Sequence, residues 1–360
     1  MRNLCRGLAF AALMGSSLFT AGAAFGIEYK IVTASPRGTY IEIGRDLAKF
    51  VAPAADVQLE ALPSAGSAEN VRRLRHEPGV KFALVQSDVY QAYLDQAAAG
   101  NREARGLISP LRLILPLYNE EIYFVARQDA PFDKVHEIRD QRISMGPIGS
   151  GTALTAATLY RQMFGSSVAD DKAQFQSNED GLSKLVTDKS VDVVIIVAGQ
   201  PAKVLADMKP EAKALIKLLK FDAQQPGGQE ALKTYFDATV RAASYPNLLT
   251  EDIPSVAVKA FLVTYNYDQG HTRRYLGNFA QSLCENFAKL QAEGHPKWKE
   301  VKLEMPEVGR GWTYFPETTR RIRSCLSPAA TPATAATPAP SPAPARRACN
   351  QQERILGICN

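Results

Sequence analysis

The chain has 360 residues, 46% of them hydrophobic, and a formal net charge of +5. Two of the positive charges lie in the N-terminal segment and a net two more in the last 34 residues, which leaves the body at +1. A body so close to neutral, without a basic stripe, excludes the electrostatic surface that nucleic-acid binding requires, while about 300 residues suffice for two packed lobes.

The N-terminus predicts a signal for export. Arg2 and Arg6 precede an apolar run from Leu8 to Phe19, and small residues follow. About a dozen apolar residues are too few to cross a ~30 Å hydrocarbon layer, so the pattern favours a cleaved signal peptide over residues 1–23. No later run reaches 18 apolar residues, and we therefore predict a periplasmic protein without membrane insertion after cleavage.

Strand and helix patterns alternate over residues 27–120, the first part of a predicted first lobe. Strands are predicted at 29–33, 57–62 and 81–85, followed by helices at 41–50, 67–74 and 88–99. Two more strand-like segments, 111–117 and 122–126, bracket the polar Asn119-Glu120-Glu121. We interpret this polar segment as the first crossing into a second lobe. The alternation indicates an α/β protein.

The second lobe is predicted over residues 121–225. Its expected elements are a strand at 142–145, a glycine loop at 146–151, a helix from Thr152 and a strand at 191–197. The chain then returns to the first lobe between Phe221 and Tyr245, and residues 226–326 are expected to be helical, at 253–265, 272–292 and 318–326. The fold class predicted is α/β, with two mixed sheets flanked by helices, a hinge and a cleft between the lobes.

The C-terminal segment changes composition. Residues 327–348 contain almost only Ala, Pro, Thr and Ser, which predicts a disordered linker, and residues 349–360 form a cysteine-bounded tip. Four cysteines remain after export and allow three pairings. We favour Cys284–Cys325 and Cys349–Cys359, because each pair lies within one type of segment. Neither CxxC nor Cys/His spacing is present, so we predict no metal site and no cofactor.

The most informative motif is Gly146-Pro147-Ile148-Gly149-Ser150-Gly151-Thr152, between a predicted strand and a predicted helix. Free N–H groups of the first helical turn, with the Ser150 and Thr152 hydroxyls, would form an anion cradle. The motif lacks the lysine of a Walker loop and the spacing of a dinucleotide site, and no histidine is placed to activate Ser150. We therefore predict no enzyme. The alternative is a glycine turn without a ligand.

Further polar or glycine loops follow other predicted strands, where ligand crevices of open α/β sheets lie. They are Gly38-Thr39-Tyr40, Ser64 to Asn70, Gln86-Ser87-Asp88 and Gly199-Gln200-Pro201. The predicted ligand-binding residues are Arg37, Thr39, Tyr40, Gly66, Ser67, Asn70, Gln86, Ser87, Asp88, Tyr118, Gly149, Ser150, Gly151, Thr152, Gly199, Gln200 and Pro201.

As a set, these loops resemble the TAXI family, solute receptors of tripartite TRAP transporters, over roughly residues 28–320. The resemblance implies a two-lobed periplasmic-binding-protein fold of type II-like architecture that delivers its ligand to an ion-gradient-driven permease. It also implies small carboxylate ligands such as glutamate and related dicarboxylates. The sequence departs from the family at Arg37, where a glycine is common, at Ile41-Glu42, where Tyr-Pro is usual, and in its extra tail.

We predict from these observations a periplasmic receptor, without catalysis, for a small organic anion that is a carboxylate or amino-acid-like. The alternative is a periplasmic sensor or adaptor that signals to a partner. Arg37 should lie at the cleft mouth, facing the loop 146–151. It would either pair with a ligand carboxylate in a bidentate fork or steer anions from the rim.

Overall fold

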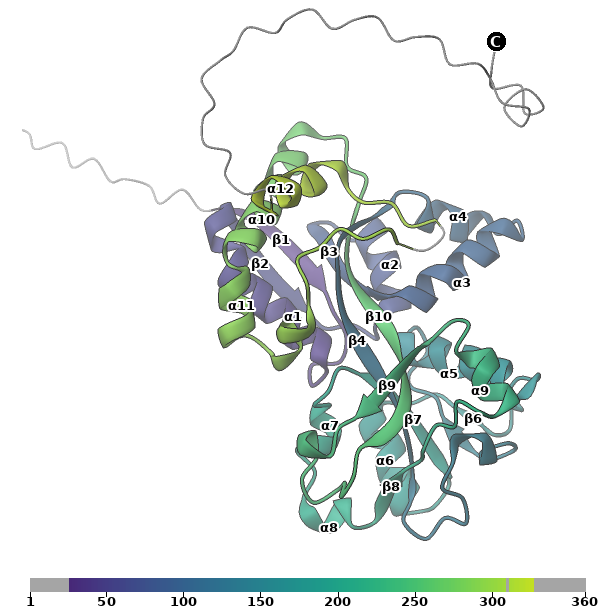
Figure 1. Ribbon diagram of the computed structural model, residues 1–360. Helices are drawn as coiled ribbons and strands as arrows, with labels where there is room; N and C mark the ends of the chain where they lie inside the picture. The colour runs from purple at the N-terminus through teal and green to yellow at the C-terminus, as the bar shows by residue number, and fades with distance from the viewer. Residues whose placement is uncertain (1–25, 309–310, 327–360) are drawn as a thin grey trace, which may run out of the picture. The chain divides into compact units, whose positions relative to one another are not determined.

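The computed structural model describes residues 26–308 and 311–326. The predicted signal peptide, linker, cysteine-bounded tip and Cys349–Cys359 pair lie outside these residues. The described residues belong to one compact unit, which ends at Leu326. Within that unit, two groups of strands and helices are joined by two long strands (Figure 1).

The first lobe is built on three parallel strands in the order β2-β1-β3. Their alternating or continuous apolar residues give each strand a buried face, for example Ile31 in β1 and Phe82 in β3. The strands are β1 (Ile27–Val32), β2 (Val57–Leu62) and β3 (Val80–Gln86). The helical elements are α1 (Thr39–Asp46), η1 (Leu47–Val51), η2 (Pro53–Ala55), α2 (Ser67–His76), α3 (Ser87–Ala98), α4 (Arg102–Ile108), α10 (Gly270–Glu285), α11 (Phe287–Glu293), η5 (Pro296–Glu300) and α12 (Pro316–Leu326).

The second lobe has β7, β5 and β6 side by side, with β5 parallel to both neighbours. The strands are β5 (Ile143–Ser144), β6 (Ala173–Gln174), β7 (Val193–Ala198), β8 (Ile216–Leu218) and β9 (Phe236–Val240). The helical elements are η3 (Val135–Glu137), α5 (Gly151–Phe164), α6 (Asn178–Val186), α7 (Lys203–Ala206), α8 (Pro210–Lys213), α9 (Pro226–Ala231) and η4 (Ala242–Ser244).

Two antiparallel strands, β4 (Leu111–Arg127) and β10 (Ile253–Tyr265), run through both lobes. One end of β10 pairs with β3 of the first lobe, and β4 pairs with β7 of the second. The predicted crossing at Asn119-Glu120-Glu121 lies inside β4, where we expected a break between two strands. Hydrogen bonding therefore joins the strands of the two lobes in one continuous sheet path, although each lobe has its own mixed set of strands.

The predicted helix at 253–265 is wrong, because this segment is the strand β10. It is buried along almost its whole length, and a continuous apolar run does not distinguish a buried strand from a buried helix. The return to the first lobe also occurs later than expected. Tyr235 and Val256 pack in a core cluster with residues of β7, so the segment from 226 to the middle of β10 lies with the second lobe.

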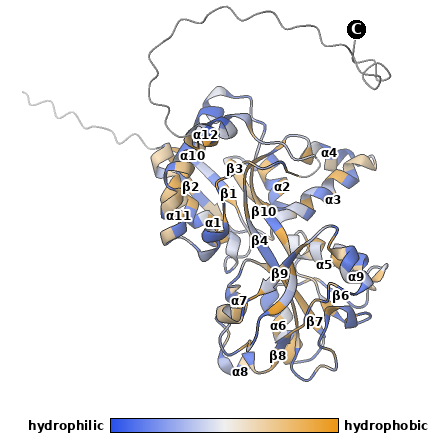
Figure 2. Cartoon of the chain, in the orientation of Figure 1, coloured by the Kyte–Doolittle hydropathy of each residue, from blue (hydrophilic) through white to orange (hydrophobic). Residues whose placement is uncertain are grey.

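Separate apolar cores lie on the two faces of the strands in each lobe. In the first lobe one cluster includes Phe82 and Phe279, which pack at 4.4 Å between ring centroids, and another includes Tyr90. In the second lobe one cluster includes Ile195 and the other Tyr245. Figure 2 shows hydrophobic positions along the central strands β4, β7 and β10. This arrangement lets each lobe fold around its own core while sharing two strands.

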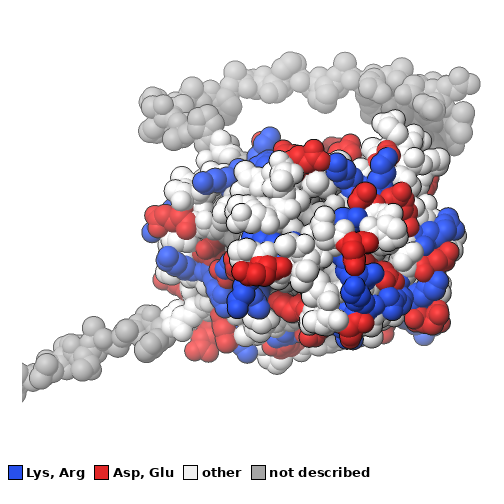
Figure 3. Space-filling view, turned by 90° about the horizontal axis from the view of Figure 1, so that it is seen from below, with Lys and Arg blue, Asp and Glu red and all other residues white. Residues whose placement is uncertain are grey.

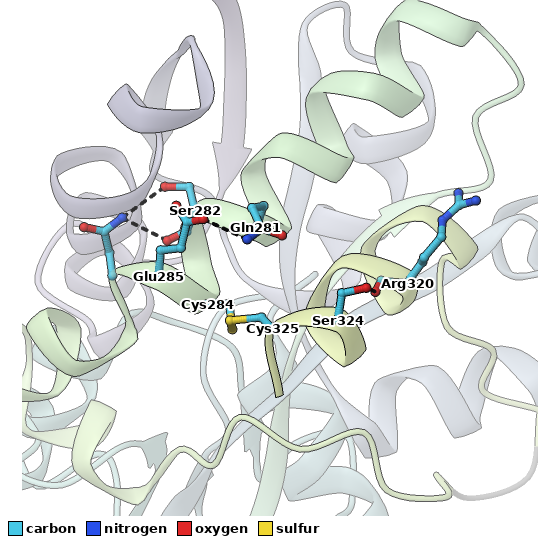
Figure 4. Close-up of a disulfide and its surroundings, with 8 residues drawn as sticks. Gln281, Ser282, Cys284, Glu285, Arg320, Ser324 and Cys325 are labelled. Carbon is cyan, nitrogen blue, oxygen red and sulfur yellow. Dashed lines mark hydrogen bonds between the residues drawn. A yellow bond between two sulfur atoms is a disulfide. The ribbon is translucent and has the colours of Figure 1, made fainter. Parts of the chain in front are cut away.

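The predicted Cys284–Cys325 disulfide is present, with 6.4 Å between the two Cα atoms. It joins the end of α10 to the end of α12, and Figure 4 shows the two helices side by side at the bond. The bond closes a loop of 41 residues in sequence separation, so it ties the last described helix to the first lobe.

The described residues contain no helix long and apolar enough to cross a membrane. Within residues 26–308 and 311–326 there is also no group of three or more His, Cys, Asp or Glu that could hold a metal ion. On the face shown in Figure 3, basic and acidic side chains are interspersed. The surface charge seen there agrees with the near-neutral body calculated from the sequence.

Candidate functional site

A cavity of about 120 Å³ lies between the two lobes. Its volume is below the roughly 300–1,000 Å³ of pockets for drug-sized ligands, so it matches a small molecule. It is lined by Ala34, Ser35, Arg37, Gly38, Thr39, Tyr40, Ala65, Gly66, Ser67, Gln86 and Glu120 from the first lobe and crossing strands. The second lobe contributes Pro147, Ser150, Gly151, Thr152, Ser177, Asn178, Glu179, Val197, Ala198, Ala202, Lys203 and Val204.

The N-terminus of α5 forms part of the cavity wall. Ser150 is the N-cap residue, and its Oγ accepts a hydrogen bond from the Ala153 N–H at 2.9 Å. The N–H groups of Gly151 and Thr152 precede this capped position and have no intrahelical acceptor. Gly146 has a φ of +80°, which a residue with a side chain rarely adopts, and so the turn into α5 requires glycine there. The wall presents N–H donors, hydroxyls and the positive end of the helix dipole.

The first lobe approaches this wall very closely. A Cβ atom on Gly151 would lie 1.5 Å from Gln86 Oε1 and 2.9 Å from Ser67 Oγ. The Glu69 N–H also donates to the Gly149 carbonyl oxygen at 3.0 Å. Glycine at 151 therefore permits the ends of β3 and α2 to meet the N-terminus of α5.

Other hydrogen bonds cross between the lobes. Thr39 Oγ1 donates to the Gly199 carbonyl oxygen at 3.1 Å, and Thr155 Oγ1 donates to Asp88 Oδ2 at 2.6 Å. Tyr235 OH also donates to the same Asp88 oxygen at 3.2 Å. Burial raises the pKa of Asp88 to about 6, although both hydroxyl hydrogen bonds favour its carboxylate. These contacts describe lobes that are closed on one another.

Two ion pairs bridge the cleft rim. Arg37 Nε lies 3.9 Å from Glu179 Oε1, and Lys203 Nζ lies 3.1 Å from Glu42 Oε1. We expect Arg37 to face the loop 146–151, but its charge partner is Glu179 at the start of α6. Its side chain is 62% exposed, which is a rim position rather than an internal one. Both cations at the rim are thus already paired.

Glu120, from the crossing strand β4, also lines the cavity and is only 4% exposed. Tyr40 OH donates to its Oε2 at 2.6 Å. Burial raises the pKa of Glu120 to about 8, and the Tyr40 hydrogen bond opposes that rise. Burial likewise raises the pKa of Tyr40 well above its usual range, so its hydroxyl keeps its proton.

The structure brings many of the predicted site residues together and leaves others apart. Those that line the cavity are Arg37, Thr39, Tyr40, Gly66, Ser67, Gln86, Ser150, Gly151 and Thr152. Those outside the lining are Asn70, Ser87, Asp88, Tyr118, Gly149, Gly199, Gln200 and Pro201. Asn70 is occupied by hydrogen bonds to the Thr33 and Leu84 carbonyl oxygens, and Gln200 by Glu121. The hydrogen bonds of these two side chains therefore stabilise the fold.

Sequence reasoning missed Glu120 and the start of α6, Ser177 to Glu179, as lining residues. A sequence pattern at each of these two positions could have indicated its role. Glu120 is a charged residue within an apolar strand, and Ser177 followed by Glu179 and Asp180 is a helix-start pattern whose Ser177 Oγ accepts from the Asp180 N–H. The polar segment at 119–121 had been interpreted only as a crossing.

Two mixed lobes, two crossing strands and a cavity between the lobes define a two-lobed α/β fold. The chain belongs to the NMT1-like family, whose sequence model matches residues 31–309.

Several solved structures are similar in fold at low sequence identity. A binding-protein component of an ABC phosphonate transporter from Pseudomonas aeruginosa is 12% identical, covers 83% of this chain and 94% of its own, and has a TM-score of 0.46. A Xanthomonas citri protein with bound ATP is 13% identical, with 83% and 95% coverage and a TM-score of 0.44. The periplasmic binding protein BugD is 14% identical, with 83% and 94% coverage and a TM-score of 0.47.

Proposed function

We propose that the protein is a periplasmic solute receptor that closes its two lobes on a small organic anion, without catalysing a reaction on it. The observation that carries this proposal is the cavity between the lobes, where the first turn of α5 and the hydroxyls of Ser150 and Thr152 form part of the wall. Free N–H groups at a helix N-terminus favour negative charge.

Closure would itself contribute to recognition. Contacts such as Thr39 to Gly199 and Asp88 to Thr155 form only when the lobes meet, so a ligand that fills the cavity favours the closed state. Export, which such a receptor needs, rests on the N-terminal sequence pattern. The resemblance to TAXI receptors further supports delivery to an ion-gradient-driven TRAP permease.

A thermal-shift screen of carboxylates and amino acids on the purified mature protein tests the binding function. A ligand at about 100 times its Kd should add about 2.7 kcal/mol to the free energy of unfolding. Absence of stabilisation by every member of the screen, each at millimolar concentration, would contradict the proposal.

Transport and signalling are then distinguished with the ligand found. Uptake of that ligand in cells should disappear when the gene is deleted and return when it is restored. Unchanged uptake, together with loss of a ligand-dependent transcriptional response, would instead support the sensor or adaptor.

A further inference from the structure

A second cavity, of about 530 Å³, lies beside the two crossing strands. Its lining comes from the start of α3, from β4 and β10 and from the start of β9, and it shares no residue with the lining of the cavity between the lobes. The volume falls within the roughly 300–1,000 Å³ of sites for drug-sized ligands. This cavity is therefore large enough for a ligand of its own.

Three aromatic side chains, Phe236, Phe261 and Trp312, form what we call the aromatic wall of this cavity. The Trp312 ring stacks on Tyr90 with 3.7 Å between ring centroids and meets Phe261 edge-on at 4.5 Å. Phe236, at the start of β9, is 48% exposed. Removing apolar surface from water stabilises a complex, so the aromatic wall favours an apolar or aromatic group.

The lining also contains a lysine without a partner. Lys259 on β10 is half-buried, and among the described residues no hydrogen bond or ion pair involves it. The other charged groups of the described lining are either satisfied or solvated. Lys233 pairs with Glu230, Asp88 accepts two hydroxyl hydrogen bonds, and Glu307 is exposed to water. Lys259 is thus the lining charge that is withdrawn from water without compensation.

The strand geometry places this lysine beside the aromatic wall. The pairing of β10 with β4 changes register between Lys259 and Phe261, and both side chains line the cavity. Burial lowers the pKa of Lys259 from its usual value of 10.5, while the Glu300 carboxylate opposes the fall, so the ammonium form persists at neutral pH. Withdrawing an ammonium from water costs free energy, which an anion beside it would offset.

We propose that this cavity is a second binding site, for a small amphipathic anion. The apolar or aromatic part of the ligand packs against the aromatic wall, and its anionic head group pairs with Lys259 Nζ. The site goes beyond the solute-receptor function proposed above and does not depend on what the cavity between the lobes binds.

Tryptophan fluorescence reports on this site. The chain has two tryptophans, and Trp298 is fully buried in the core of the first lobe, whereas Trp312 lines the cavity. The mature protein is titrated with 4-phenylbutanoate, with 4-phenylbutanol, which lacks the charge, and with butanoate, which lacks the ring. Phenylbutanoate should change the emission and bind at least about tenfold more tightly than either of the others. In Trp312→Phe the change in emission should disappear.

The variant Lys259→Met keeps most of the length of the side chain and removes its charge. It should weaken binding of phenylbutanoate by at least about tenfold and change binding of phenylbutanol by less than about threefold. Lys209→Met, at an exposed position just before α8 in the second lobe, is the matched control and should change neither affinity.

Three outcomes would overturn the proposal. The first is equal affinity for phenylbutanoate and phenylbutanol, or a Lys259→Met variant that binds phenylbutanoate normally. The second is an emission change that persists in Trp312→Phe, because the probe would then act elsewhere. The third is a dimer in sedimentation velocity that Phe236→Ser converts to a monomer, because a second copy would then cover the cavity. The probe comparison uses the unmodified protein, so it decides the question even if Lys259→Met does not fold.

Discussion

Two adjacent glutamates on β4, Glu120 and Glu121, meet very different surroundings. Successive residues of a strand point to opposite faces, and here Glu120 lines the cleft cavity while Glu121 lines a separate pocket beside β9. Glu121 Oε1 accepts from Lys297 Nζ at 2.7 Å, and its Oε2 accepts from the Gln200 N–H at 2.9 Å. Burial raises the pKa of both carboxyls, and the Lys297 ammonium opposes the rise at both, but only at Glu121 does it also donate a hydrogen bond.

The difference separates an acid that pairs with a buried cation from one that lines the cavity and accepts a single hydrogen bond. Lys297 is fully buried and also pairs with Glu300. The carboxylate of Glu121 therefore has its cationic partner within the protein. The region around Glu120 has one hydrogen bond and one open acceptor. Burial and charge alone would not distinguish these two residues; their partners do.

The largest expected effect comes from removing the cation that pairs with Glu121. Lys297→Met should lower the free energy of unfolding by about 3–5 kcal/mol, because it leaves Glu121 buried without its cation. Urea denaturation at pH 7 measures the change, and adding Glu121→Gln to the variant should restore part of it. Lys220→Met, which removes an exposed pair with Glu251, is the control and should have little effect. A loss below about 1 kcal/mol would show that the buried pair adds no net stability.

Next comes the pH dependence of stability at Glu120. Its pKa is raised from 4.5 to about 8, so the folded state holds a proton that the unfolded state releases. The stabilising contribution is complete below pH 4.5 and is lost as pH rises towards 8. Glu120→Gln does not titrate, so its stability relative to the wild type should increase with pH, by at most about 1.4 kcal/mol per unit, and level off above pH 8.

Urea denaturation of both proteins from pH 5 to 9 gives this difference directly. The lowered pKa of His295, about 4 because of burial, is present in both proteins and cancels in the comparison. The Asp88 carboxylate helps to raise the pKa of Glu120, so its influence belongs to the measured difference. A difference that does not vary with pH would mean that Glu120 is not protonated in the unliganded fold.

A smaller effect is expected where the lobes meet. Gly151→Ala places a methyl group on Gln86 of the other lobe, so it should oppose closure and weaken ligand binding by about tenfold or more. Isothermal titration with the ligand from the screen measures the loss. Gly106→Ala is the matched control, because nothing lies within 4 Å of its added Cβ in α4 and affinity should be unchanged. Equal affinities for all three proteins would mean that closure does not require this contact.

The smallest effect is expected at the rim. The Arg37–Glu179 pair is 3.9 Å long with side chains 62% and 35% exposed, so Arg37→Ala should reduce ligand affinity by less than about fivefold. The change should appear mainly in the association rate and diminish at high salt. A loss of thirtyfold that persists at 0.5 M salt would show instead that Arg37 binds the ligand directly.

Much of the site follows from local sequence. The glycine loop and Ser150 identify the N-terminus of α5, since cap and turn chemistry depends on residues within a few positions of each other. The Cys284–Cys325 disulfide was predicted from segment type alone and is present. The polar residues at 119–121 marked the crossing for a similar reason, because charges interrupt an otherwise apolar strand.

Other features depend on contacts that sequence patterns do not contain. The segment 253–265 is apolar on both faces, and only its pairing between β3 and β4 makes it a strand that joins the lobes. Arg37 was expected to face the glycine loop, but the packing of α6 places Glu179 near it. Asn70 is a predicted ligand-binding residue, yet its amide donates to the carbonyl oxygens of Thr33, just after β1, and of Leu84 in β3.

The sequence by itself determined the α/β alternation, the loops at strand ends and the capped, glycine-rich N-terminus of α5, because these depend on periodicity and on neighbouring backbone groups. Only the tertiary structure decided which acid of the Glu120-Glu121 pair is satisfied by the protein and which faces the cavity. Lys297 lies 176 residues from Glu121 in the sequence and Tyr40 lies 80 from Glu120. Solvation and pairing of a buried charge depend on groups brought together by folding, and no local pattern records them.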